Sequence, residues 1–244
     1  MHLKVLSTGS KSNGYLLQGE GSSLLLDAGL QIAQISKGIS FHGLSACLVT
    51  HEHQDHAKAA RDLARRGITV IASAGTAAAI GLQGPFYRPI KAGESTRVNN
   101  WTILAFETQH DAAEPIGFLI RNEVTGESII YATDTYYLKY RFPGTHYWLI
   151  ECNYTEESLD RQVANGTIDE ELKTRLTKSH MSLERLITAL QANDLSDTRL
   201  IVLVHLSDTR SDERYMTSRI EHFTGKPTVA AHNGDSIDLE LTPF

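Results

Sequence analysis

The chain has 244 residues, of which 41% are hydrophobic and 21% charged, as in an ordinary soluble globular protein with a sizeable core. The formal net charge of −6 argues against a broadly basic surface for nucleic acid, although bound metal ions would reverse the local field inside a cleft. No apolar stretch reaches the length of a membrane span, and residues 1–4 do not resemble a signal peptide, so we expect a cytoplasmic enzyme.

The first 30 residues predict three short strands. Apolar runs at residues 3–6, 15–18 and 22–27 are separated by the polar, glycine-bearing loop 7–14 and by a turn signal at 19–21. Three strands in so short a segment indicate antiparallel pairing without intervening helices. The third strand ends on Asp27.

From residue 46 the pattern changes to strands that alternate with helices. A strand over 46–50 is followed by a helix over 57–66, which Gly67 is well placed to end. A strand over 69–72 and an alanine-rich helix over 74–80 follow. This alternation is typical of a sheet covered by helices.

The second half of the chain predicts more strands and a group of helices. We found no linker, low-complexity segment or short repeat, and therefore expect a single domain that spans residues 1–244. The expected strands are 101–108, 116–121, 128–132, 147–151, 200–204, 228–231 and 236–241, and the expected helices are 155–178 (interrupted near 165–166), 182–192 and 212–223.

One short segment carries most of the chemistry. Residues 51–56 read His-Glu-His-Gln-Asp-His and lie between an apolar strand and a helix. Three imidazoles and a carboxylate at such a junction can be aimed at one point, and these are groups that bind first-row divalent metals. A chance His-x-His pair is the alternative, but the strand-to-helix context favours a metal site.

Other candidate ligands follow apolar runs further along the chain. His110, Asp134 and His205 each come directly after an expected strand, whereas His180 precedes a helix. A single histidine at a strand end is more often a hydrogen-bonded structural residue. Four candidates downstream of residues 51–56 instead favour a site with two metal ions, which needs about eight to ten ligand positions including waters.

These motifs together resemble the metallo-β-lactamase-fold hydrolases over almost the whole chain. Residues 24–29, Leu-Leu-Leu-Asp-Ala-Gly, resemble the first motif of that superfamily, and residues 51–56 resemble the second. His110, Asp134 and a late histidine complete the series. The resemblance implies an α/β (α+β) fold, a four-layer αββα sandwich of two mixed β-sheets flanked by helices, with the site at one edge.

Within that superfamily the chain is similar to the YycJ/WalJ-type subgroup, which is related to tRNase Z. The similarity rests on residues 9–13, 110–112, 133–135 and 205–207. The subgroup's loop usually reads Gly-Ser-x-Gly-Asn, and Ser12 replaces the second glycine here.

The resemblance also implies a set of ligands for two divalent ions, with zinc preferred and manganese as the alternative. One ion would be bound by His51, His53 and His110. The other would be bound by Asp55, His56 and His180, with Asp134 bridging the two. His205 competes with His180 for the last place, and His180 is preferred. Asp27 is expected to orient a ligand histidine through its free ring nitrogen.

The expected activity is hydrolysis of a phosphodiester, in DNA or RNA or a nucleotide-like compound, by a hydroxide that bridges the metals. Asp55 could orient the nucleophile, and His205 could protonate the leaving oxygen, or His180 if it is not a ligand. One alternative is a small-molecule ester or thioester hydrolase on the same metals, and another is a non-catalytic binding module. The oligomeric state is open, with a homodimer among the alternatives.

Overall fold

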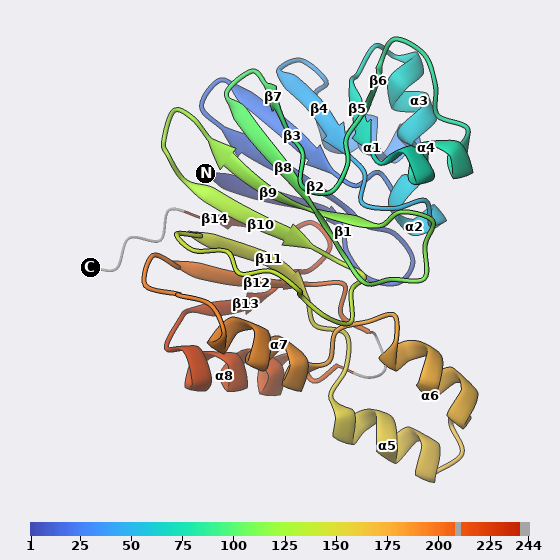
Figure 1. Cartoon of the computed structure of the whole chain (residues 1–244), viewed down its shortest axis with the longest axis vertical. Helices are drawn as coiled ribbons and strands as arrows, with labels where there is room; N and C mark the ends of the chain where they lie inside the picture. Colours follow the sequence, from blue (N-terminus) through green and yellow to red (C-terminus); the bar gives the residue numbers. More distant parts are fainter. Residues whose placement is uncertain (208–210, 240–244) are drawn as a thin grey trace.

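Two seven-stranded mixed β-sheets pack face to face in the computed structural model of the chain, with helices on both outer faces (Figure 1). The structure describes residues 1–207 and 211–239. The expected αββα sandwich is therefore confirmed. Among the described residues, no helix combines the length and apolar character needed to cross a membrane.

The first sheet has the strand order β14-β1-β2-β3-β4-β5-β6. Strands β1, β2 and β3 pair antiparallel, as predicted, and β3 to β6 pair in parallel. The strands are His2–Ser7 (β1), Gly14–Gly19 (β2), Ser22–Leu26 (β3), Leu44–Leu48 (β4), Val70–Ala72 (β5), Tyr87–Pro89 (β6) and Ser236–Asp238 (β14).

The second sheet has the order β13-β12-β11-β10-β9-β8-β7, antiparallel from β7 to β10 and parallel from β10 to β13. Its central strands are buried on both faces, which explains their continuous apolar runs. The strands are Ser95–Val98 (β7), Trp101–Glu107 (β8), Ile116–Asn122 (β9), Ser128–Ala132 (β10), Tyr147–Glu151 (β11), Leu200–Val204 (β12) and Thr228–Ala230 (β13).

The main core lies between the two sheets. Alternate residues of β1, Leu3 and Val5, point into it, and Trp101, Phe118 and Tyr131 fill it from the second sheet. Helices Ile32–Gly38 (α1), Gln54–Ala57 (α2), Ala60–Arg65 (α3) and Ala74–Ile80 (α4) cover the first sheet, and Leu183–Gln191 (α7) and Glu213–Thr224 (α8) cover the second.

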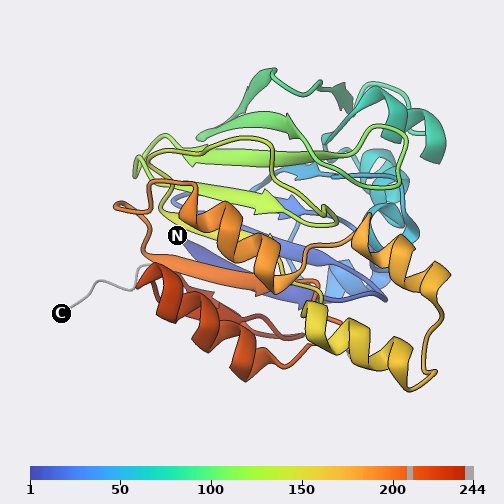
Figure 2. The same cartoon turned by 60° about the horizontal axis from the view of Figure 1, so that its bottom comes forward.

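Two further helices, Glu156–Ala164 (α5) and Glu170–Thr177 (α6), form a hairpin that projects from the sandwich (Figures 1 and 2). Its polar sequence was expected to be helical with a break near residue 165, and the two helices agree with that. The hairpin lies at the side toward which the parallel strands of the second sheet run (Figure 1).

The structure also differs from the expected elements. Helix α1 and strands β6 and β7 were not predicted, because α1 has few apolar residues and the two strands are short and largely exposed. The helix expected over 57–66 is split into α2 and α3, and α2 begins inside the histidine motif. The last expected strand ends at Asp238 among the described residues, and residues 240–241 lie outside them.

Gly29 allows three segments of the site to pack together. A Cβ at this position would lie 1.7 Å from the backbone oxygen of Asp55 and 2.8 Å from the backbone nitrogen of Asn13. The Gly29 amide donates to the carbonyl of Asn13, whose own amide donates to the carbonyl of Asp55. No side chain fits between these backbones.

We therefore expect Gly29→Ala to destabilise the protein by about 3 kcal/mol, the upper end of the range for overpacking, because the clash is with backbone. Urea unfolding followed by circular dichroism measures the change. Gly38→Ala is the matched control, since its Cβ would meet only the flexible end of Leu6. Equal unfolding midpoints for Gly29→Ala and wild type would contradict this packing argument.

Candidate metal centre

The candidate ligands gather where the strands of both sheets end. Asp27 directly follows β3, and His51 lies three residues after β4. His110, Asp134 and His205 follow β8, β10 and β12 within three residues. Because the strands are anchored in the core, these side chains are positioned by the fold and need no long flexible loop.

Three of these residues have an unusual backbone conformation. Asp27, Asp134 and His205 have φ angles of 56°, 50° and 53°, in the left-handed region. That conformation costs a non-glycine residue roughly 1–3 kcal/mol and persists only where the surroundings enforce it. Each left-handed residue ends a buried strand, so the chain turns sharply at the shared edge. This clustering of strain is typical of a functional site.

The first group of potential metal donors contains His51, His53, His110 and Asp134, whose donor atoms all lie within 4.8 Å of one another. Nδ1 of His53 lies 3.2 Å from Nε2 of His110, and Nε2 of His51 lies 3.4 Å from Oδ2 of Asp134. Burial lowers the pKa of His51 and of His110 below the ordinary value for histidine. The neutral form of imidazole is the one that binds divalent metals.

The second group contains Asp55, His56, Asp134 and His205, again with donor atoms within 4.8 Å of one another. Nε2 of His56 lies 3.3 Å from Oδ2 of Asp55 and 3.0 Å from Oδ2 of Asp134. Nε2 of His205 lies 3.7 Å from Oδ2 of Asp55. All members except Asp55 are buried.

Asp134 stands between the two groups. Both of its oxygens face imidazoles, and its side chain is only 3% exposed. Oδ2 lies 3.4, 3.0 and 3.7 Å from Nε2 of His51, His56 and His110, and Oδ1 lies 3.0 and 3.7 Å from Nδ1 of His205 and His180. A carboxylate with two oxygens in such surroundings has the geometry of a bridging ligand.

Opposite charges balance among the histidines and carboxylates of the cluster. Burial alone would raise the pKa of Asp134, but His205 and His56 outweigh it and hold that pKa well below its ordinary value. Burial likewise opposes the protonation of His56 and His205, yet the Asp134 carboxylate raises the pKa of both imidazoles. A divalent ion would compete with protons for these ring nitrogens, because imidazole binds metal in its neutral form.

Asp27 orients His56 of the second group through a hydrogen bond to the ring nitrogen that faces away from Asp134. Its Oδ2 atom accepts a hydrogen bond of 2.7 Å from Nδ1 of His56, which leaves Nε2 of His56 to face Asp134. The Asp27 carboxylate also accepts bonds from the Thr50 amide at 2.8 Å and the Tyr131 hydroxyl at 2.5 Å. The expected contact of Asp27 with a histidine ring nitrogen is therefore present.

Unpaired buried nitrogens show that the donor set suits a cation. Among the residues that the structure describes, Nε2 of His51 and Nε2 of His205 are buried without a hydrogen-bond partner. A buried polar atom without a partner costs about 1–3 kcal/mol, and native proteins rarely tolerate it without a reason. Imidazole nitrogens and carboxylates that converge in this way fit divalent ions such as zinc.

A third group adds a carboxylate that the sequence analysis missed. Glu151, the last residue of β11, is fully buried, and its Oε1 atom lies 2.7 Å from Nδ1 of His180 and 3.1 Å from Nδ1 of His205. Its Oε2 atom accepts the Thr135 amide at 3.0 Å. The rule that found Asp134, an acid at the end of an apolar strand, would have found Glu151 if glutamate had been included.

The two histidines that compete for the last ligand position lie side by side, with ring centroids 5.4 Å apart. Both belong to the third donor group with Asp134 and Glu151, but only His205 also belongs to the second group, with Asp55 and His56. Burial lowers the pKa of His180, but the Glu151 carboxylate outweighs this and raises it. The other predicted ligands all lie in the first two groups, and the choice between His180 and His205 as the last ligand stays a prediction.

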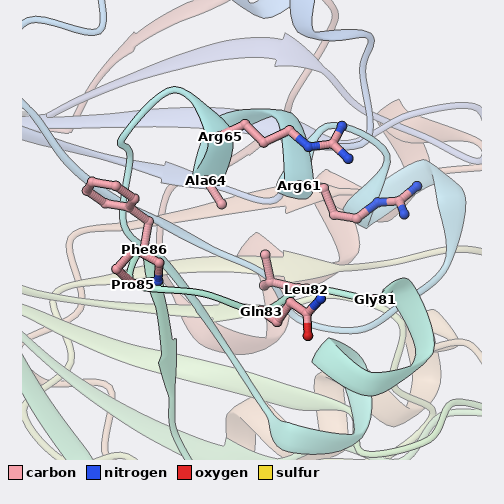
Figure 3. A pocket seen from close by; sticks show the side chains of 8 residues that line it. All are labelled: Arg61, Ala64, Arg65, Gly81, Leu82, Gln83, Pro85 and Phe86. Carbon is pink, nitrogen blue, oxygen red and sulfur yellow. The ribbon is translucent and has the colours of Figure 1, made fainter.

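The donor groups open into a cavity of about 290 Å³ at the edge of the sandwich. It is lined by His53, Asp55, His110 and Asp134, by His180, and by residues of α6. A larger hollow of about 470 Å³ lies beside α3 (Figure 3), but none of its lining residues belongs to a donor group. We therefore take the smaller cavity as the functional site.

Known proteins resemble this chain in sequence and in fold. Residues 23–206 match the family described as beta-lactamase superfamily domain. The chain is 29% identical over 222 residues to the exodeoxyribonuclease WalJ of Streptococcus pneumoniae, covering 83% of this chain and 80% of that protein. It is also 29% identical over 224 residues to the exodeoxyribonuclease YycJ of Bacillus anthracis, covering 85% and 83%. The metallo-beta-lactamase fold protein YhfI from Bacillus subtilis has a similar structure, with a TM-score of 0.74 at 15% identity over 97% of this chain and 98% of that chain.

Proposed function

This chain belongs to the beta-lactamase superfamily, and on that premise we propose that it is a metal-dependent phosphodiesterase that cleaves nucleic acid with two divalent ions. The observation that carries the proposal is Asp134, a buried carboxylate with one histidine-rich donor group on each side. The relatives named as exodeoxyribonucleases support DNA as the substrate class.

The distances support two ligand sets, which we assign as follows. His51, His53 and His110 would bind one ion, and Asp134 would bridge to the second. For the second ion we take Asp55, His56 and His205, with His205 in the place that the sequence analysis gave to His180. Zinc suits this set of nitrogen and oxygen donors best, and manganese is the alternative. When bound, such ions supply Lewis acidity and lower the pKa of a coordinated water.

His180 is then free to act on the leaving group. Its side chain is 19% exposed, lines the same cavity as the ligands and is held by Glu151 at 2.7 Å. A histidine that is fixed by a buried carboxylate on one ring nitrogen presents the other nitrogen in a defined direction. We assign to His180 the donation of a proton to the departing oxygen, and to Glu151 the orientation of His180.

Elemental analysis and a simple assay test the proposal together. Protein reconstituted with zinc or manganese and then desalted should hold two ions per chain and hydrolyse bis(p-nitrophenyl) phosphate and single-stranded DNA. His232→Ala is a control, because His232 lies in an exposed cluster with Glu213 and Asp235. Fewer than about 0.2 ions per chain, against the tight binding of a complete ligand set, would contradict the proposal.

A further inference from the structure

We propose that Arg175 binds a phosphate that flanks the scissile one, so that the site prefers nucleic-acid strands to compounds with a single phosphate. This inference rests on the proposed function and adds the substrate feature that the site selects. Arg175 lies on α6, and it lines the same cavity as His53, Asp55 and Asp134.

Arg175 is the one side chain with a permanent positive charge among the described residues that line this cavity. Among the described residues that line the cavity, no other arginine or lysine is present, whereas Asp55, Asp111 and Asp134 are acidic. Two metal ions would offset those carboxylates near the scissile phosphate, but they would not reach every phosphate of a strand. A phosphate next to the scissile one would therefore be bound by the positive charge of Arg175.

The guanidinium of Arg175 is available for such a contact. It is exposed, and within residues 1–207 and 211–239 it has no hydrogen bond or ion pair. Other cations of the hairpin are engaged: Arg161 pairs with Glu157 at 2.6 Å, and Lys173 pairs with Asp160 at 2.8 Å. Five donors in a planar fork make arginine well suited to phosphate oxygens.

Helix α6 is held firmly enough to position Arg175. Leu176, the next residue, is buried in a small core with Tyr154 and Leu159. At the end of the helix, Arg185 of α7 donates a hydrogen bond of 2.6 Å to the carbonyl of Thr177. The hairpin thus has its own apolar contacts and a polar tie to the helix that covers the second sheet.

Binding of an oligonucleotide tests Arg175 without turnover. We would measure the anisotropy of a labelled single-stranded oligodeoxynucleotide with cleavage-resistant phosphorothioate linkages over a range of salt concentrations. Arg175→Ala should weaken binding about tenfold and lower the slope of log K against log salt by about 0.7, the value for one phosphate contact on a single strand. Arg175→Lys should restore most of the slope. Arg161→Ala, a cation of the same hairpin that does not line the cavity, should bind like wild type.

Activity on two substrates separates this inference from the proposed function. All three variants should hydrolyse bis(p-nitrophenyl) phosphate like wild type, because that compound has no flanking phosphate. Wild-type affinity and salt slope in Arg175→Ala, or an equal loss of activity on both substrates, would overturn the role of Arg175. No hydrolysis of either substrate by the metal-loaded wild type would overturn the proposed hydrolase instead, and the binding comparison would still decide the role of Arg175.

Discussion

Replacing Asp134 with asparagine is expected to reduce phosphodiester hydrolysis by about a thousandfold or more and to lower the metal content below two ions per chain. The carboxylate has two anionic oxygens, each facing imidazole nitrogens from a different side. An amide offers one neutral oxygen and an NH₂ group that carries no lone pair for a metal. The variant therefore loses the bridge and the negative charge together.

Asparagine is the right substitute because of the backbone at this position. Asp134 has a φ of 50°, and asparagine adopts the left-handed conformation more readily than alanine. The variant should thus fold, and circular dichroism would verify that it does. Asp111→Asn serves as the matched control, since Asp111 lines the same cavity outside the donor groups. Two bound ions and activity within tenfold of wild type in Asp134→Asn would contradict the bridging role.

The fold could be predicted from the sequence wherever the local pattern of apolar and polar residues reflects burial. Alternating and continuous apolar runs located the buried strands, and residues 51–56 located the histidine motif at a strand-to-helix junction. Strands β6 and β7 were missed because they lie at sheet edges, where pairing with one neighbour requires little apolar sequence. Local composition is a poor guide to such edge strands, even where the partner is the neighbouring strand in the chain, as β8 is for β7.

The choice between His180 and His205 shows a different limit. Both follow plausible signals, and only the packing of the two sheets brings His205, which follows β12 of the second sheet, to Asp55 and His56, which follow β4 of the first. The left-handed turn at His205 is also set by tertiary contacts. One of them is the hydrogen bond of 3.1 Å that the backbone amide of His205 donates to Oγ1 of Thr8. Neither the packing of His205 against Asp55 and His56 nor its left-handed conformation can be predicted from the residues around position 205.

His205→Ala and His180→Ala should fail in different ways, and this contrast is the second large effect that we predict. Loss of His205 removes a donor from the second group, so His205→Ala should retain about one ion per chain and lose activity on every substrate. Loss of His180 leaves both donor groups intact, so His180→Ala should retain two ions. Elemental analysis of both variants distinguishes a ligand from a residue that acts on the substrate.

The leaving group provides the second measurement for His180. p-Nitrophenolate departs without a proton, whereas the alkoxide released from DNA needs one. His180→Ala should therefore cleave DNA about 10²- to 10⁴-fold more slowly, the range for a general acid, with little loss on bis(p-nitrophenyl) phosphate. Glu151→Gln should show a smaller loss of the same kind, because it still places an oxygen beside Nδ1 of His180.

Unlike Arg175→Ala, the His180 variant should bind the oligonucleotide with unchanged affinity and salt slope. One ion per chain in His180→Ala and two in His205→Ala would reverse the assignment and restore His180 as the ligand.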